Sequence, residues 1–416
     1  MALLAIPVTV AVALILVPLL VKTLDRNAGW PLGLTFLGLA GYVIKHADPI
    51  LNGETATWSV TWIKGFLTGA GGGAGAASAG GTAGAASEGS LDLALKMDSL
   101  GLFFTLLALL IGAVVFIYSA AYLHKGDKIM SFYVLMTSFM LAVLLLVLAD
   151  DVALLFIGWE LVSLASFFLI ARSGSGGEAG SIRTLLLTFI GGLFLLAALA
   201  IGVITTGTTN LSAMLHSPAW EGQDVRLAIV AVLIALAAFS KAAQIPFHFW
   251  LPEAMAADTP VSAFLHAAAV VKAGVYLLLR FSGLFEGVMA WHVLLIVTGM
   301  TTAIMGAVFA IQKTDLKKLT AYSTVSQLGW IVATIGVGTP FAISAALVHT
   351  AAHALFKSSL FMIVGVVDHQ AGSRDIRRLG PLWRQMPFTF VSAVIAAASM
   401  AAVPPTFGFV SKEGML

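Results

Sequence analysis

A few charged and histidine side chains lie deep within long apolar stretches of this sequence. Glu160 lies in LLFIGWELVSLASFF, Lys241 in LIALAAFSKAAQIPFHFWLPEAM and Lys272 in PVSAFLHAAAVVKAGVYLLL. A charged residue at the centre of a membrane helix costs roughly 2.5–3.5 kcal/mol, so each must be paired, hydrated or neutral. Buried lysines change their proton affinity readily, and histidines titrate near neutral pH. Residues of these types therefore indicate a site that takes up and releases protons.

Glu160 is predicted to form an ion pair with Lys241. Asp150 and Asp151 begin the same apolar segment, and solvent at a helix end explains them. Glu160 lies about nine residues further along, or roughly 13 Å of helical rise, so its carboxylate needs a cation. The alternative is a glutamate whose side chain reaches water from near the helix end. At about 4 Å and an effective dielectric constant of about 20, the pair is worth roughly 4 kcal/mol before desolvation, enough to switch Lys241 between its charged and neutral forms.

Two apolar segments are interrupted by proline, and each carries a lysine. Pro246 follows Lys241 by five residues, and the motif PPTFGFVSKE places Lys412 after two prolines. Proline removes a backbone donor and breaks a helix. Broken helices at membrane depth must line protein or water, and transporters place ion sites there. Lys241, Lys412 and His248, which lies in the first break, are therefore predicted to be functional; the alternative is polar filling of the breaks without proton exchange.

Three further polar residues share one face of a helix. His349, His353 and Lys357 are spaced four residues apart in ALVHTAAHALFKSSLF, so they form a stripe. This stripe predicts a proton relay; a metal site and structural polar packing are the alternatives. HxxxH spacing can bind metal, but no nearby acid completes a ligand set, and the cationic lysine opposes a dication.

His266 precedes Lys272 by six residues, about 120° around the helix, so a water rather than direct contact would link them.

The composition indicates an all-α integral membrane protein. Hydrophobic residues make up 59% of the 416 residues, charged residues only 10%, and mean hydropathy is +1.00. Soluble domains carry roughly 25% charged residues. The apolar runs are too long, and too little alternating, to predict strands. We predict twelve transmembrane helices, of which the seventh and twelfth are broken, at residues 3–21, 30–47, 99–121, 132–149, 152–171, 182–206, 225–244, 260–281, 289–311, 318–337, 341–367 and 386–404.

The basic residues predict the orientation of these helices. Most lysines and arginines, Lys317 and Lys318 among them, lie in loops that follow odd-numbered segments. The positive-inside rule then places these loops in the cytoplasm and the N-terminus outside. Residues 69–90, rich in Gly and Ala, are predicted to form an external flexible loop. A phosphate-binding loop is disfavoured because no strand precedes this segment and it lacks GxxxxGK[ST].

The two broken segments also predict an internal repeat. They lie five segments apart, which indicates an inverted repeat that relates helices 4–8 to helices 9–13. Because the chain ends inside the second broken helix, the second repeat is expected to be incomplete and the chain to be a fragment. We divide the chain into residues 1–98, with two helices and the external loop, and a transmembrane core at 99–416, truncated in helix 12.

Other features of the composition exclude several functions. The chain contains no cysteine, which excludes disulfides, cysteine-ligated iron–sulfur clusters and thiol catalysis within it. The net charge of +2 gives no nucleic-acid footprint. No cofactor or resident metal is expected.

Several long motifs resemble one superfamily. The chain resembles the large antiporter-like subunits of multisubunit Mrp-type Na⁺/H⁺ antiporters, respiratory complex I and membrane-bound hydrogenases. Within this superfamily it is most similar to the A subunits of Mrp-type antiporters, on PFHFWLP, VVKAG and VDHQAGSRDIRRLG. The matching segments, which cover most of residues 98–413, are DSLGLFF, WELVSLASFFLI, KAAQIPFHFWLPEAMAADTPVSAFLHAAAVVKAGVYLL, DLKKLTAYSTVSQLG, ALVHTAAHALFKSSLFMIVGVVDHQAGSRDIRRLG and PPTFGFVSKE.

The resemblance implies roles for the candidate residues. Glu160 and Lys241 match the family's ion pair, Lys412 its terminal lysine and His248 the position after the first break. A central relay is implied for Lys272, His349, His353 and Lys357. It further implies a non-enzymatic transporter of H⁺ and Na⁺ in the bacterial plasma membrane, with other membrane subunits as partners. The alternatives are a proton-pumping subunit of complex I or a hydrogenase, and a structural subunit that conducts no ion.

Overall fold

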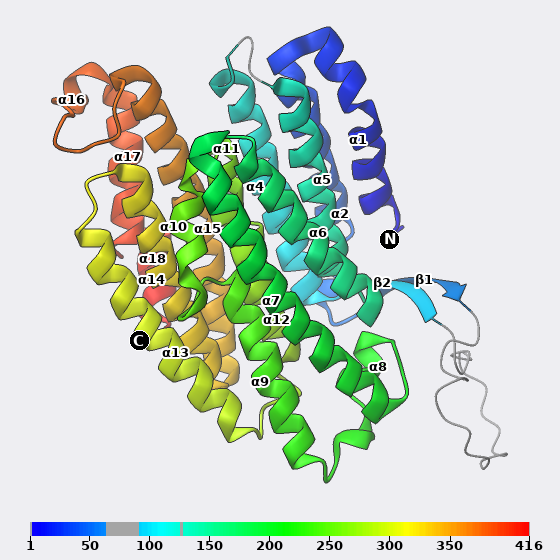
Figure 1. Cartoon of the computed structure of the whole chain (residues 1–416). Coiled ribbons are helices and arrows are strands. Elements are labelled where there is room, and N and C mark those ends of the chain that lie inside the picture. The colour runs from blue at the N-terminus through cyan, green and yellow to red at the C-terminus, as the bar shows by residue number, and fades with distance from the viewer. Residues whose placement is uncertain (1, 64–90, 125–127, 416) are drawn as a thin grey trace.

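Long helices form one bundle. The computed structural model describes residues 2–63, 91–124 and 128–415. Figure 1 shows most long helices side by side, with their ends gathered at two faces. The long and medium helices are α1 (Ala5–Leu24), α2 (Gly29–Lys45), α4 (Ser99–Tyr122), α5 (Ile129–Leu148), α6 (Val152–Ala171), α7 (Ser175–Thr206), α9 (Asp224–Lys241), α11 (Thr259–Ala267), α12 (Val270–Phe281), α13 (Met289–Ile311), α14 (Leu316–Val337), α15 (Pro340–Ala371), α17 (Pro387–Met400) and α18 (Phe407–Glu413).

Short helices lie in the connections. They are η1 (Asp25–Ala28), α3 (Asp48–Leu51), α8 (Leu211–Leu215), η2 (Pro218–Trp220), η3 (Phe247–Phe249), α10 (Trp250–Glu253), η4 (Ala254–Ala256) and α16 (Leu382–Gln385). Because α16 and α8 lie at opposite ends of the bundle in Figure 1, we call these the α16 end and the α8 end.

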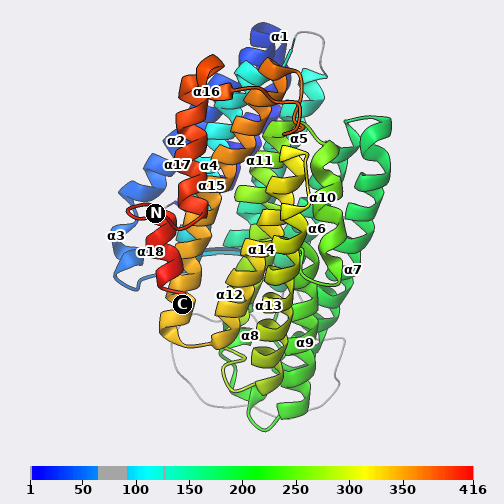
Figure 2. The ribbon, with the colours of Figure 1, turned by 90° about the vertical axis from the view of Figure 1, so that its left-hand side faces the viewer.

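The protein is a multi-pass membrane protein. Among the described residues, eight helical stretches are long and apolar enough to cross a bilayer. Each of the twelve predicted segments coincides with a helix or with two consecutive short helices. The stretch formed by α11 and α12 is completely buried, and α11 packs against α15. Figure 2 shows α15 between α11 and α17, and α14 packs against both α12 and α15.

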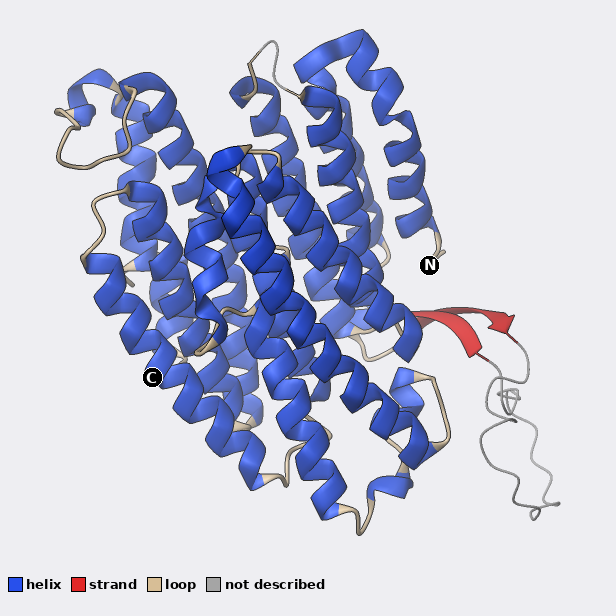
Figure 3. Ribbon diagram, in the orientation of Figure 1, coloured by secondary structure: helices blue, strands red, loops and turns tan. Residues whose placement is uncertain are grey.

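A β-hairpin, drawn in Figure 3, corrects the prediction that the chain has no strands. Strands β1 (Ala56–Ile63) and β2 (Leu91–Met97) pair antiparallel. The sequence ATWSVTWI is rich in β-branched and aromatic residues, which favour strands, but a search for membrane-length apolar runs passes over it. The predicted Gly/Ala-rich loop 69–90 lies outside the described residues.

Both proline breaks are present. After α9 the backbone adopts a positive φ at Ala243 and a cis bond before Pro246. After α17 a positive φ at Ala402 precedes a cis bond at Pro405. A third interruption, between α11 and α12, divides the segment that we predicted as continuous at 260–281. It contains neither Pro nor Gly, so its sequence gives no signal of a break.

Candidate functional site

Six of the nine predicted site residues are completely enclosed by protein. Their exposed fractions are 0–1%, and they belong to α9, α11, α12 and α15. They are Lys241, His266, Lys272, His349, His353 and Lys357. The prediction that these polar groups are buried in the bundle is therefore confirmed. Their hydrogen-bond partners then show how the fold accommodates them.

Lys241 is bound by α6. Its Nζ donates to the carbonyl oxygen of Trp159 at 2.6 Å and to Oγ of Ser163 at 2.9 Å. The same ammonium lies 4.5 Å from the centre of the Trp159 ring, in cation–π geometry. A fully buried lysine thus has two oxygen acceptors and an aromatic face in place of water.

Glu160 and Lys241 interact through their charges, as the predicted pair requires, but their side chains make no direct contact in this structure. No carboxylate lies within 4.0 Å of Lys241 Nζ among the described residues. Oε1 of Glu160 is buried without a hydrogen-bond partner, and a Cβ added at Gly192 of α7 would lie 1.8 Å from it. Trp159 and Ser163 are four residues apart and face Lys241, whereas Glu160 is turned about 100° from Trp159, toward α7.

The first break is closed by neutral side chains. Nε1 of Trp250 donates to the carbonyl oxygen of Ser240 at 2.8 Å. The amide of Ile245 donates to Oγ1 of Thr302, on α13, at 3.1 Å. His248 is buried beside Phe249, with ring centres 4.0 Å apart, and its Nδ1 has no hydrogen-bond partner. Trp250 and Thr302, which we did not predict, therefore satisfy backbone groups in this break.

Lys272 meets His353 at the centre of the bundle. Lys272 Nζ lies 2.9 Å from His353 Nδ1, so a hydrogen bond joins α12 to α15. Nε2 of His353 and both ring nitrogens of His266 are buried without hydrogen-bond partners among the described residues. The His266 ring instead lies beside Phe361, with centres 4.5 Å apart. As expected, Lys272 and His266 make no direct hydrogen bond.

The other two members of the α15 stripe face α14 and α18. Nε2 of His349 lies 3.0 Å from Oε1 of Gln327, and its Nδ1 lies 2.9 Å from Oγ of Ser411. Lys357 donates to Oγ of Ser323 and, at 3.2 Å, to the carbonyl oxygen of Thr320. The stripe is therefore one row on α15 that contacts three other helices.

Lys412 closes the second break. Its Nζ donates at 2.8 Å to the carbonyl oxygen of Met400, the last residue of α17. This side chain is only partly buried. The lysine thus donates to a backbone carbonyl that the end of the helix leaves without an intrahelical partner.

Lys317 is a buried lysine that sequence reasoning assigned wrongly. We counted it among the loop residues that set topology, but it is 3% exposed and donates to the carbonyl oxygen of Ala257. Its neighbour Lys318 is exposed. Two successive lysines at the start of a helix look like the basic residues of a loop. Because successive helix residues point about 100° apart, one of the two can be buried while the other is exposed.

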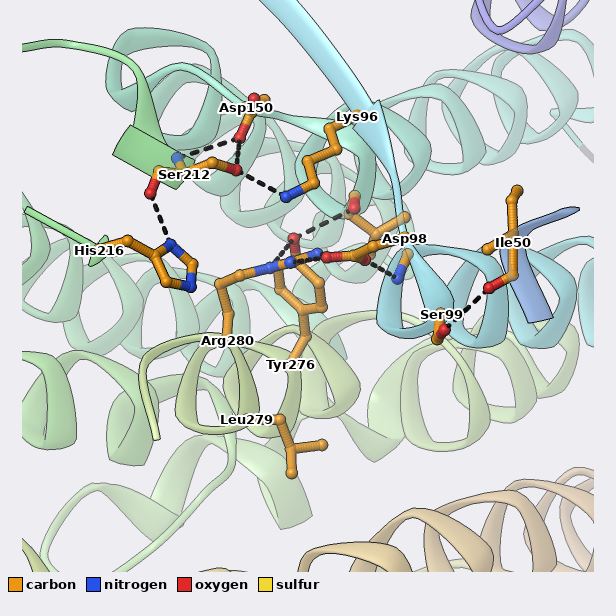
Figure 4. A network of polar contacts seen from close by, with 12 residues as sticks. Ile50, Lys96, Asp98, Ser99, Asp150, Ser212, His216, Tyr276, Leu279 and Arg280 are labelled. Carbon is orange, nitrogen blue, oxygen red and sulfur yellow. Dashed lines mark hydrogen bonds and ion pairs between the residues drawn. The ribbon is translucent and has the colours of Figure 1, made fainter. Parts of the chain in front are cut away.

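A second polar network lies toward the α8 end of α12. Tyr276 and Arg280 follow Lys272 at four-residue intervals, and Nε of Arg280 donates to Tyr276 Oη at 3.1 Å. Arg280 also pairs with Asp98, whose Oδ1 accepts from Gly101 N at the start of α4. Figure 4 shows this pair beside the Lys96–Ser212–Asp150 contacts. Burial alone would raise the pKa of Asp98, but the hydrogen bond and charge of Arg280 lower it below its usual value.

The chemistry available to this site follows from its side-chain types. The described ranges contain no group of three or more His, Asp or Glu side chains placed to hold a metal ion. Its groups are amines and imidazoles in hydrogen-bond contact with one another or with neutral oxygens. Such groups bind and release single protons.

Comparisons with known proteins place the chain in one family. Residues 149–416 match the family described as NADH:quinone oxidoreductase/Mrp antiporter, TM. Residues 85–133 match NADH-Ubiquinone oxidoreductase (complex I), chain 5 N-terminus. The first match alone includes more than half of the chain.

Curated relatives carry antiporter names. The A/B component of a probable K(+)/H(+) antiporter of Rhizobium meliloti is 44% identical over 78% of this chain and 32% of its own length. The A component of the Na(+)/H(+) antiporter of Alkalihalophilus pseudofirmus is 36% identical over 96% of this chain and 49% of its own length. The chain therefore spans between about a third and a half of these relatives.

Solved structures share the fold. A chain of the Mrp complex from Dietzia sp. DQ12-45-1b has 52% identity and a TM-score of 0.88, covering 98% of this chain and 42% of that one. A chain of an archaeal membrane-bound sulfane sulfur reductase has 23% identity and a TM-score of 0.81, covering 99% of this chain and 80% of that one; it shows the fold alone. From the family match and these relatives, the chain belongs to the NADH:quinone oxidoreductase/Mrp antiporter transmembrane family.

Proposed function

We propose that this chain is one of the subunits of a multisubunit antiporter that exchanges H⁺ for Na⁺. The observation that carries the proposal is the row of buried lysines and histidines, joined at its centre by the 2.9 Å contact between Lys272 and His353. The names of two relatives support cation/proton antiport: the relative at 36% identity is named for Na(+)/H(+) exchange and the relative at 44% identity for K(+)/H(+) exchange. They favour it over a proton-pumping subunit of complex I or a hydrogenase.

The proposed proton route crosses four helices. It runs from Lys241 on α9 to Lys272 on α12, His353 on α15 and Lys412 on α18. His349 and Lys357 extend the row along α15, while His248 and His266, whose rings each have an unpartnered buried nitrogen, add proton acceptors beside it. Each buried ammonium has an oxygen or nitrogen acceptor, so the row is solvated by protein.

Glu160 is proposed to switch this row. Its carboxylate faces Gly192 here, and a side-chain rotation would carry it toward Lys241. A pair closed to about 4 Å would favour the ammonium by roughly 4 kcal/mol at an effective dielectric constant of about 20. Opening the pair would remove that attraction and release the Lys241 proton to the next site.

We also propose twelve membrane-crossing helices with the N-terminus outside, residues 1–98 preceding an antiporter-like core at 99–416. Two five-helix units would be related as inverted repeats. The equal spacing of the two breaks supports this: a positive-φ alanine precedes the proline by three residues in both, Ala243 before Pro246 and Ala402 before Pro405. In each break a side chain donates to a backbone carbonyl near the end of the preceding helix. Trp250 donates to Ser240 of α9, and Lys412 donates to Met400 of α17.

The setting of the proposed function is the bacterial plasma membrane, with other membrane subunits as partners. The Mrp complex to which the chain is similar supports this assembly. The row requires no cofactor, since lysine, histidine and glutamate bind protons directly. The chain is accordingly proposed to be part of a transporter and not an enzyme.

Antiport in everted vesicles tests the proposal. Glu160→Ala and Lys241→Ala should each abolish Na⁺/H⁺ exchange while the subunits still assemble, because each removes one member of the proposed switch. The control is Lys22→Ala, which should retain exchange because Lys22 is exposed in the last turn of α1. Normal exchange by either site variant, in correctly assembled protein, would disprove the switch.

A further inference from the structure

A cavity of about 460 Å³ lies outside the proton row, toward the α16 end. Its walls come from the start of α7, from α10 and η4, and from the connection between α13 and α14. Figures 1 and 2 both show α10 between the first turns of α7 and the α13–α14 connection. The proton row does not use any of the residues that line this cavity.

The lining of the cavity is strongly cationic. It includes Arg183, Lys313, Lys318 and Arg374, with Glu253 as the one lining carboxylate, for a formal charge of +3. Arg183 pairs with Glu253, and Arg374 pairs at 2.7 Å with Asp315, which caps α14. Within the described part of the chain, neither Lys313 nor Lys318 has a carboxylate within 4.0 Å.

Apolar surface continues from the cavity along the bundle. Arg183 is 62% exposed at its side chain, and Leu186 and Ile190 follow it on the same face of α7 with exposed fractions of 55% and 40%. On the other side Lys313 lies 5.1 Å over the ring of Tyr322, an amphipathic side chain of the type enriched at membrane interfaces. The cavity is thus basic at the helix ends and bordered by apolar helix surface toward the bundle centre.

We propose that this cavity binds the phosphate headgroup of an anionic phospholipid. Lys313 and Lys318 would contact the phosphate, and the acyl chains would lie against Leu186 and Ile190 on α7. A basic pocket between membrane helices is the arrangement that recognises anionic headgroups. A soluble phosphate ion would use the same two lysines but would leave the adjoining apolar surface uncovered.

The test uses the intact assembly purified in neutral detergent. Native mass spectrometry would compare binding of phosphatidylglycerol and phosphatidylcholine to wild type and to Lys313→Gln/Lys318→Gln. Wild type should prefer phosphatidylglycerol, and the double variant should lose roughly fivefold in that affinity for each lysine removed. The control Lys22→Gln/Lys128→Gln removes two exposed lysines at the same end and should bind as wild type does.

A second readout uses the unmodified protein. Acylation of lysines by an activated ester, followed by peptide mass spectrometry, should show Lys313 and Lys318 protected by phosphatidylglycerol and not by phosphatidylcholine, while Lys22 reacts equally. Equal binding of both lipids, or equal losses in the two double variants, would overturn the proposal. Protection by inorganic phosphate without any effect of phosphatidylglycerol, or protection by a partner subunit in delipidated protein, would likewise overturn it.

Discussion

Lys272 and His353 lie 81 residues apart in the chain, yet their side chains make the central contact of the row. Spacing along one helix predicted that His349, His353 and Lys357 share a face. It did not reveal which helix that face meets, because periodicity describes a helix by itself and not its neighbours. Gln327 and Ser411 were missed for a related reason: neutral polar residues in apolar segments carry no charge that marks them.

The contact between Lys272 and His353 predicts non-additive effects of substitution. Lys272→Ala and His353→Ala should each lower antiport by roughly tenfold or more. The double variant should be little worse than either single variant, because both substitutions interrupt the same step. The measurement is the antiport rate in vesicles, normalised to assembled protein, for wild type, the two single variants and the double variant. Multiplicative losses would show that the two side chains act independently.

At the scale of elements, the first break depends on one hydroxyl. Thr302→Val removes the acceptor of the Ile245 amide while nearly preserving side-chain shape, and leaves a half-buried N–H without that partner. The cost is expected to be about 1–3 kcal/mol, measured as a lower thermal unfolding midpoint. Thr301→Val is the matched control, since the neighbouring hydroxyl is exposed and bonds only within its own helix. Equal effects of the two substitutions would disprove the role of Thr302.

The pair of Asp98 and Arg280 predicts a pH-dependent contribution to stability. Asp98→Asn retains an acceptor for capping α4 but removes the charge, so at neutral pH it should destabilise by about 2 kcal/mol. Because folding lowers the pKa of Asp98, the stabilisation is complete above the unfolded value of about 3.9 and is lost as pH falls through the folded value.

Thermal unfolding midpoints measured from pH 7 to pH 3 check this sign. The difference between wild type and Asp98→Asn should shrink at the acidic end. Glu221→Gln, an exposed carboxyl substitution near the α8 end, should track wild type throughout. A difference that grows on acidification would contradict the assignment.

Helix positions were predictable because long apolar runs have few alternatives in a bilayer, and the proline breaks because proline removes a donor. Three features were not predictable in this way. The interruption at Ala268 and Ala269 has no helix-breaking residue, and the hairpin is shorter than any membrane segment. Lys317 is buried, but it stands next to the exposed Lys318 and was therefore counted with it as a loop residue. The hairpin has a local strand signal in ATWSVTWI, whereas the other two features have none that marks them in the sequence.

For the whole molecule, the charge distribution predicts that the α8 end faces outward and the α16 end faces the cytoplasm. The chain has no natural cysteine, so single cysteines report accessibility directly. Ala219→Cys and Arg378→Cys lie in exposed connections at opposite ends. A membrane-impermeant maleimide should label the first and not the second in intact cells. The reverse pattern would invert the proposed topology.

The β-hairpin has a practical consequence for studying the intact assembly. Ile63 pairs with Leu91 at the outer end of the hairpin, so the two strand ends farthest from the bundle lie side by side. The ladder begins at the Ala56–Met97 pair, and its β2 strand is joined to the bundle where the carbonyl oxygen of Ala94 accepts a hydrogen bond from the Asp150 amide. A fluorescent or affinity domain inserted between Ile63 and Leu91 would therefore join two strand ends that are already paired, and it would leave the sequence of every described helix unchanged.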